Sequence, residues 1–442
     1  MTAVRLPLRG LLPFAGGSIG MGIWVTVPGI FLLFFLTEVL AVPPLAAGFA
    51  LLLPNVLDVV LHPWVGRLSD ADRAGHGNRR RLMFLGCLVV PAFVALFAVP
   101  AGLHGLSAAI WVAAALVAGN LLYSLYQVPY LATPADLSIG YHERTRLMGF
   151  RNVVITVGVL LSGVVAPLLT GDDPGVGDYA RMALLFGAVM VVAMLTGIGG
   201  VARLHRAAPG TPVPAGPHGG LLTALRDRQF RALTTSYLTM AVTMSLVLAA
   251  VPYFAEYGLG RPELTSALVG AFMAPAVLAT PLWVLVARRF GKQRGLLTAQ
   301  ALFVAGALVP SAGTAAGLPV VLGAMVLLGI AFAGMQLMPL SMVPDIIAAS
   351  GPAGTARAGS YTGVWTAAEA TGGAIGPYVY SACLAAGGFV ASAAGDHTIQ
   401  SLAALDAVRY GFTLVPAALM TIAVLLQRRY TLDQVAAALT AA

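Results

Sequence analysis

An aspartate within an apolar segment is the residue of this sequence with the clearest chemical potential. Asp58 lies among leucines and valines, and His62 follows four residues later, so both occupy one face if the segment is helical. A charge at the centre of a bilayer costs about 2.5–3.5 kcal/mol on insertion scales, so such carboxylates usually mark functional sites. The pair therefore indicates a cation or proton site. The alternatives are a structural ion pair for Asp58 and, for His62, a hydrogen bond to a carbonyl freed by Pro63.

Two further groups of side chains suit the recognition of a small solute. Glu369 lies four residues after Trp365 in a stretch rich in glycine and alanine, where it takes part in coupling or forms a structural ion pair. Gln127 lies near Tyr123 and Tyr126, and hydrogen-bonding groups beside aromatic faces suit a polar organic solute, although tyrosines also pack helices together. Trp365 either stacks on a substrate or serves as a lipid-interface anchor or a packing residue.

The composition places these residues in a membrane protein. Of the 442 residues, 59% are hydrophobic and 10% are charged, and the mean hydropathy is +0.88, whereas soluble domains carry about 25% charged residues. The net charge of +8 comes from basic residues in short loops, so it reflects membrane orientation rather than nucleic-acid binding. Cys87 and Cys383 fall in apolar segments of opposite halves, which argues against a disulfide framework or a cysteine metal site.

Twelve segments are apolar enough to cross a bilayer, which takes about 20 residues. They run over approximately 12–37, 45–66, 82–101, 107–132, 147–169, 181–202, 232–255, 264–286, 295–315, 319–344, 358–385 and 408–427. We expect an all-α polytopic membrane protein with two pseudo-symmetric bundles of six transmembrane helices, at residues 1–202 and 232–442. A cytoplasmic linker rich in proline and glycine joins them at 203–231.

The basic residues predict the orientation of these segments. Both termini and the loops on their side hold 21 of the 25 lysines and arginines, and Arg151 lies inside the fifth segment. Only Arg181, Arg261 and Arg409 lie on the opposite side. Because basic loops stay in the cytoplasm, both termini are expected there.

The two halves of the sequence resemble each other. Pro63-Trp64 and Pro281-Leu282-Trp283 each precede a basic loop, and acidic residues end the fourth segment of each half. We expect loop charges to form ion pairs that hold one conformation and break in the other, although a solvated basic loop also explains the arginines. The gating candidates are Gly66, Asp70, Arg73, Arg79, Arg80, Arg81, Asp136, Arg144, Asp345 and Arg357. Related halves are typical of alternating-access carriers.

Several motifs together resemble one family of carriers. They are Asp58-x-x-x-x-Pro63-x-x-Gly66-x-x-x-Asp70 with Arg79–Arg81, Gln127-Val128-Pro129-Tyr130 with Glu143-Arg144-Thr145 and Arg151, Gly363-Val364-Trp365-Thr366, and Tyr430-Thr431-Leu432-Asp433. The chain resembles the glycoside–pentoside–hexuronide:cation symporters, the melibiose-permease branch of the major facilitator superfamily. The resemblance covers most of the chain. It implies sugar–cation symport and a place for Arg151 beside the substrate, unless Arg151 belongs to the cytoplasmic arginine cluster.

Some positions depart from the sodium-using members of that family. A second aspartate and an asparagine are replaced by His62 and Leu61, and imidazole is a poor ligand for a hard cation that prefers oxygen. Ser124 matches the family's hydroxyl, Gln127 replaces a sugar-binding aspartate, and Glu369 stands at or beside the place of a lysine. The expected coupling residues are Asp58, His62, Ser124 and Glu369, and the expected substrate residues are Gln127, Tyr123, Tyr126, Arg151 and Trp365.

We therefore expect a secondary active transporter, a proton-coupled symporter of a small polar organic solute such as a sugar or glycoside. The alternative is a proton-antiport exporter of a more hydrophobic metabolite or drug-like compound. An enzyme is not expected, because no His-Glu-x-x-His pattern occurs, and an ATP-driven pump would need a phosphate-binding loop that the sequence lacks. We expect a monomer in the inner (plasma) membrane, with the small-molecule substrate and the lipid bilayer as partners, and no nucleic acid, metal or cofactor.

Overall fold

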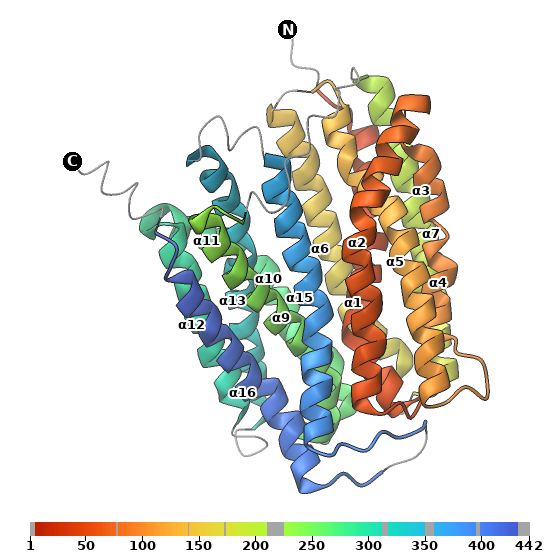
Figure 1. The fold of residues 1–442 in the computed structure, drawn as a ribbon, viewed down its shortest axis with the longest axis vertical. Helices are drawn as coiled ribbons and strands as arrows, with labels where there is room; N and C mark the ends of the chain where they lie inside the picture. Colours follow the sequence, from red (N-terminus) through yellow and green to blue (C-terminus); the bar gives the residue numbers. More distant parts are fainter. Residues whose placement is uncertain are drawn as a thin grey trace. The chain divides into compact units, whose positions relative to one another are not determined.

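The predicted apolar segments fold into helices in the structure, a computed structural model of the chain (Figure 1). It describes residues 5–76, 78–139, 141–171, 174–209, 225–311, 317–349, 358–394 and 398–431. Within these ranges the regular elements are all helical, accompanied by two isolated β-bridges.

The chain divides into two units, and unit 1 comprises Met1–Pro214 together with Ala391–Thr398. Its helices are coloured red to yellow-green in Figure 1. They are α1 (Leu8–Glu38), α2 (Pro44–His76), α3 (Arg80–Gly86), α4 (Val89–Phe97), α5 (Leu106–Asp136), α6 (Tyr141–Thr170) and α7 (Val176–Ala207). The short helices α3 and α4 together fill one predicted span.

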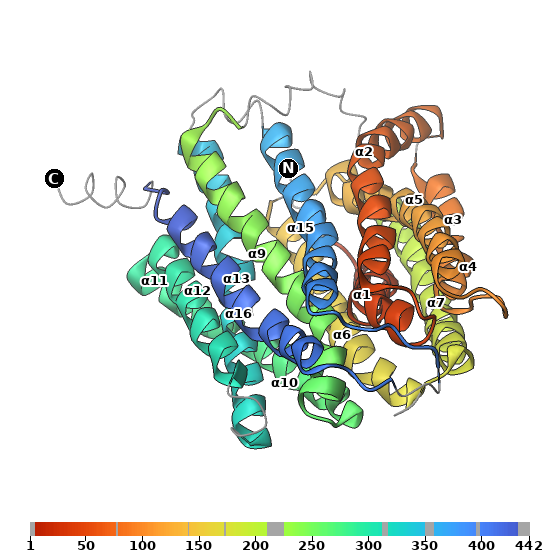
Figure 2. The same ribbon diagram turned by 60° about the horizontal axis from the view of Figure 1, so that its bottom comes forward.

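Unit 2 comprises Ala215–Val390 and Ile399–Ala442. Its elements are α9 (Arg228–Tyr253), a π-helical turn η1 (Phe254–Gly258), a 3₁₀ turn η2 (Pro262–Leu264), α10 (Thr265–Leu278), α11 (Thr280–Phe290), α12 (Lys292–Leu308), α13 (Leu318–Ala349), α15 (Ala358–Ala386) and α16 (Leu402–Gln427). Figures 1 and 2 both show α9 and α15 side by side within this unit.

The helix lengths confirm the expected fold class. The described residues contain nine helices that are long and apolar enough to span a membrane, or ten if α10 and α11, bent by 48°, count as one span. The α3–α4 and α10–α11 breaks lie just before Pro91 and Pro281, where the missing N–H interrupts the helical hydrogen bonds. The helices α2 and α15 also match predicted spans, and they carry Asp58 and Glu369. The orientation of the termini stays a prediction.

The interior of unit 1 is held by close approach of α1, α5 and α7. The Tyr126 hydroxyl, on α5, donates to the carbonyl of Met194 on α7 at 3.2 Å. A Cβ atom added at Gly197 would lie 2.8 Å from the Cα atom of Gly17, so only glycine permits this crossing of α1 and α7. These helices therefore form a tightly packed, buried support.

The connection between α15 and α16 joins unit 1 at the turn that follows α1. Ser392 donates its N–H to the carbonyl of Thr37 at 2.9 Å, and its own carbonyl accepts from the N–H of Ala41 at 3.0 Å. The Ser392 hydroxyl also donates to the Glu38 carboxylate at 2.8 Å, and both side chains are buried. We call Ala391–Thr398 the docking segment, because the chain leaves unit 2, binds unit 1 there and returns.

Candidate functional site

The clearest cluster of chemical groups in unit 2 surrounds Glu369. The Tyr237 hydroxyl, on α9, is hydrogen-bonded to the Glu369 carboxyl group, on α15. The ring of Tyr237 stacks on Trp365, one turn before Glu369, with ring centroids 3.8 Å apart and planes 23° apart. Both rings are buried, whereas Glu369 is exposed. The cluster thus presents an accessible carboxyl group at the edge of an aromatic stack.

The indole of Trp365 adds a hydrogen-bond donor to this cluster. Its Nε1 atom is buried and has no hydrogen-bond partner among the described residues. An unpaired buried N–H costs about 1–3 kcal/mol, so such a group usually has a reason. The exposed carboxyl group of Glu369 can accept hydrogen bonds from a solute that carries hydroxyl groups, and the buried indole N–H is an unused donor one turn away.

The small residues of α15 bring it against α9. The Ser245 hydroxyl, on α9, donates to the carbonyl of Gly372 at 2.8 Å. A Cβ atom added at Gly376 would lie 2.0 Å from the Ser245 Oγ atom and 2.6 Å from the backbone nitrogen of Leu246. The two backbones therefore approach closely just beyond Glu369, which fixes Tyr237 opposite the carboxyl group.

Gly376→Val is expected to destabilise the protein by about 1–3 kcal/mol, because the new side chain must push α9 and α15 apart. Gly373→Val is the matched control, since a Cβ atom there meets nothing within 4 Å. Thermal unfolding of the purified variants in detergent measures the effect. Equal unfolding temperatures for the two variants would contradict the close contact.

The predicted coupling site in unit 1 lies on α2 and α5. The helical backbone of α2 carries Asp58 and His62, but these two side chains lie outside the part that the structure describes. One turn before Asp58, Asn55 accepts a hydrogen bond at 3.1 Å from the side-chain amide of Asn120 on α5. Ser124, one turn after Asn120, is fully buried. The amide pair, which the sequence analysis missed, thus links the two helices beside the predicted site.

The predicted substrate residues of unit 1 occupy different environments. Tyr126 is fully buried, and Tyr123 stacks on Trp24 with ring centroids 5.7 Å apart, so both pack the interior. Gln127 is half-buried. Arg151, on α6, is half-buried and donates to the Asn152 side chain at 3.1 Å. Its Nε atom is buried and has no hydrogen-bond partner among the described residues.

Asp136 forms a buried ion-pair network where α5 ends. Arg73 Nη1 lies 2.5 Å from one carboxylate oxygen, and Arg79 Nε lies 2.8 Å from the other. Arg79 also donates to the Ser69 hydroxyl at 2.7 Å. The Asp136 side chain is only 2% exposed, so two arginines neutralise one buried charge. The network joins the ends of α2 and α5 to the residue before α3.

Unit 2 has a related but more exposed pair. Lys292, at the start of α12, lies 2.5 Å from the carboxylate of Asp345 on α13 and donates to the Ser341 carbonyl at 2.9 Å. Arg80 is half-buried, Arg81 is exposed, and Gly66 lies within α2. The side chains of Asp70 and Arg144, and all of Arg357, lie outside the described part. Asp136 and Asp345 therefore both form ion pairs, but with basic residues that the sequence analysis did not assign to them.

Metal binding has no evident site among the described residues, where no group of three or more histidine, cysteine, aspartate or glutamate side chains is placed to hold an ion. The described polar clusters are accordingly built from hydrogen-bonding and titratable groups.

Comparison with known proteins gives the family. The profile of a family described as MFS/sugar transport protein matches residues 13–434. The chain therefore belongs to this family, within the glycoside–pentoside–hexuronide:cation symporters of the major facilitator superfamily. Family and fold are those of membrane transporters rather than enzymes, and the protein is an integral membrane secondary transporter.

Its relatives are diverse. An uncharacterized symporter of Synechocystis sp. is 28% identical over 205 residues, and the match spans 44% of this chain but only 37% of that protein. The sphingosine-1-phosphate transporter of Mus musculus is 26% identical over 72% of this chain and 68% of its own length. The isoprimeverose transporter of Lactiplantibacillus pentosus is 23% identical, over 87% and 81% respectively.

Solved structures share the fold. The nucleoside transporter NupG matches with a TM-score of 0.67 at 12% identity, covering 96% of this chain and 98% of that chain. A bacterial homologue of the iron transporter ferroportin, in its inward-facing state, matches with a TM-score of 0.66 at 15% identity, over 96% and 98%. At these identities the likeness concerns the fold alone.

Proposed function

We propose that this protein is a proton-coupled symporter of a small polar organic solute such as a sugar or glycoside. The observation that carries the proposal is the cluster of Glu369, Tyr237 and Trp365 on two membrane helices of a sugar-transporter fold. Aromatic faces pack against the apolar faces of sugar rings, while carboxyl and indole groups bond to hydroxyls. The proposed carrier is a monomer of the inner (plasma) membrane with both termini in the cytoplasm, and it works by alternating access.

Protons are the proposed coupling ion. His62 stands where sodium-using members carry an aspartate, and imidazole exchanges protons near neutral pH. Asp58 and Glu369 are carboxyl groups within membrane helices, where taking up a proton removes the cost of holding a charge within the bilayer. We propose that Asp58, His62 and Glu369 share this coupling, and that Ser124 supports the site on α5.

An imposed proton gradient, alkaline inside, is expected to drive solute accumulation in proteoliposomes, whereas an imposed sodium gradient is not. A panel of labelled sugars and glycosides, tested under each gradient separately, measures both the solute and the ion. Accumulation driven by sodium at equal pH on both sides would overturn the assignment of the ion. His62→Ala with an unchanged pH profile would assign that histidine to packing.

Export of a more hydrophobic or amphiphilic compound is the second candidate. It is favoured by the sequence similarity to a sphingosine-1-phosphate transporter over most of the chain and by Gln127 at the place of a sugar-binding aspartate. The same proteoliposomes distinguish the two functions. Efflux of a lysophospholipid against its gradient, with no uptake of any sugar, would favour export.

A further inference from the structure

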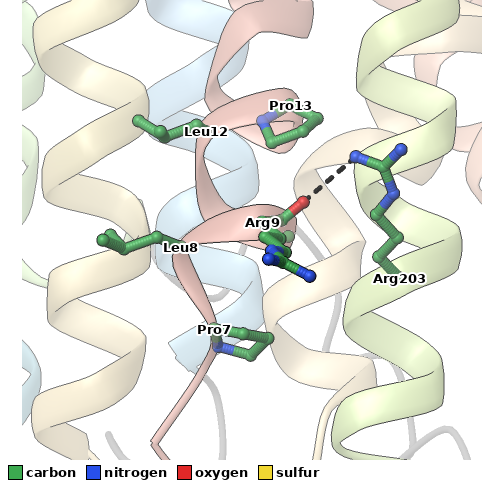
Figure 3. A pocket seen from close by; sticks show the side chains of 7 residues that line it. Pro7, Leu8, Arg9, Leu12, Pro13 and Arg203 are labelled. Carbon is green, nitrogen blue, oxygen red and sulfur yellow. Dashed lines mark hydrogen bonds between the residues drawn. The ribbon is translucent and has the colours of Figure 1, made fainter.

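A groove opens at one end of unit 1, where α1 begins and α7 ends (Figure 3). It has a volume of about 680 Å³. Its labelled lining residues are Pro7, Leu8, Arg9, Leu12 and Pro13 from α1 and its cap, and Arg203 from α7. None of the residues of the Asp136 network lines the groove, and nothing in the proposed transport cycle uses it.

The groove is basic. The Arg203 side chain reaches α1 and donates to the carbonyl of Arg9 at 3.1 Å, as the dashed line in Figure 3 shows. Arg9 and Arg203 are both exposed, and neither forms an ion pair with any described residue. The lining contains no acidic residue. Two more exposed arginines add positive charge nearby in the sequence: Arg5 precedes Arg9, and Arg206 follows Arg203.

The groove also has an apolar wall. Leu8 and Leu12, one turn apart on α1, are 52% and 54% exposed and point to the same side in Figure 3. Arginines beside exposed leucines, at the end of a membrane helix, match a molecule with an anionic group next to a hydrocarbon chain. A basic loop that serves only to orient the protein needs neither the groove nor the exposed leucines.

We propose that this groove binds an anionic phospholipid of the surrounding leaflet. Arg9 and Arg203 contact the phosphate of the head group, and Leu8 and Leu12 contact the first part of an acyl chain. By the positive-inside rule this is the cytoplasmic leaflet. The proposal is independent of which solute the protein carries, and its test needs no transport measurement.

The test compares lipid binding by the purified protein and its variants. Phosphatidylglycerol and phosphatidylcholine with identical acyl chains are titrated into the detergent-solubilised protein, and bound lipid is counted by native mass spectrometry alongside thermal unfolding. Each basic residue near a membrane surface contributes about 1 kcal/mol, so Arg9→Gln/Arg203→Gln is expected to weaken phosphatidylglycerol binding by about thirtyfold. Phosphatidylcholine binding should not change.

Three further variants make the result specific. Arg288→Gln removes an exposed arginine near the end of α11, outside the groove, and should bind like wild type. Arg203→Lys keeps the charge and should retain most of the affinity, which also guards against misfolding of the double variant. Leu8→Ser/Leu12→Ser should weaken phosphatidylglycerol but leave glycerol phosphate unaffected.

Two results would overturn the proposal. One is equal affinity of wild type and Arg9→Gln/Arg203→Gln for phosphatidylglycerol. The other is protection by inorganic phosphate or glycerol phosphate as strong as that by phosphatidylglycerol, which would identify a free anion rather than a lipid as the ligand. The proposal is supported if wild type and Arg288→Gln both prefer phosphatidylglycerol and Arg9→Gln/Arg203→Gln loses this preference.

Discussion

Glu369→Gln is expected to abolish accumulation of solute against its gradient while leaving exchange of solute across the membrane intact. Glutamine has nearly the same shape, and its amide oxygen still accepts the hydrogen bond that Tyr237 donates to the carboxyl group. It cannot take up or release a proton at this place. Proton-driven uptake and equilibrium exchange of labelled solute, measured in the same proteoliposomes, separate the two effects.

Tyr237→Phe is the matched control for that variant. It removes the hydroxyl but keeps the carboxyl group and the ring that stacks on Trp365. We expect it to weaken solute binding and to preserve coupling. Asp58→Asn tests the same requirement in unit 1. If Glu369→Gln accumulates solute like wild type, Glu369 is a structural residue and coupling depends on the α2 site.

Asp136→Asn is expected to lower the free energy of unfolding by about 3–5 kcal/mol, because it removes a buried carboxylate charge that pairs with both Arg73 and Arg79. The Asp136 and Arg79 side chains are 2% and 9% exposed, so solvent replaces little of the lost interaction. The same change should loosen the ends of α2 and α5 and reduce transport. Thermal unfolding and uptake, measured on one preparation, check both expectations.

An exposed ion pair provides the comparison for Asp136. Glu263 pairs with Arg261 at 2.9 Å, and both side chains are about half exposed, at 45% and 53%. Solvent screens such an exposed pair, so Glu263→Gln should unfold close to wild type. A loss of stability in Asp136→Asn no larger than that in Glu263→Gln would show that the buried network does not hold the fold.

The sequence was sufficient to predict the helices because a membrane span is a local property. About twenty consecutive apolar residues in a bilayer must pair their backbone groups within the segment, which favours a helix. Each span can therefore be recognised from its own residues. The ends were harder to predict. The span expected at 45–66 continues in α2 as far as His76, because a helix extends beyond the hydrocarbon wherever polar side chains can reach water. The break before Pro91 was also not anticipated.

The partners of the functional residues could be predicted only in part, because they depend on which helices pack together. Glu369 and Trp365 stood out by type, but Tyr237 lies far away in sequence and becomes relevant only when α9 packs on α15. Gly372 and Gly376, which follow Glu369 on the same helix, were the available sign in the sequence that another helix packs closely there. Likewise, Asp345 was predicted as a gating residue near a helix end, but its contact with Lys292 depends on how α12 packs against α13.

The docking segment fixes the connection between α15 and α16 to the turn that follows α1. Ser392 is bonded to Thr37, Glu38 and Ala41, a few residues after α15 ends at Ala386. The Gln400 side chain also ties the two ends of this connection together. Its amide nitrogen donates to the Val390 carbonyl at 2.7 Å, and its amide oxygen accepts from the Val390 N–H at 3.0 Å. The loop that joins α15 to α16 is thus held to the turn after α1 by main-chain and side-chain hydrogen bonds together.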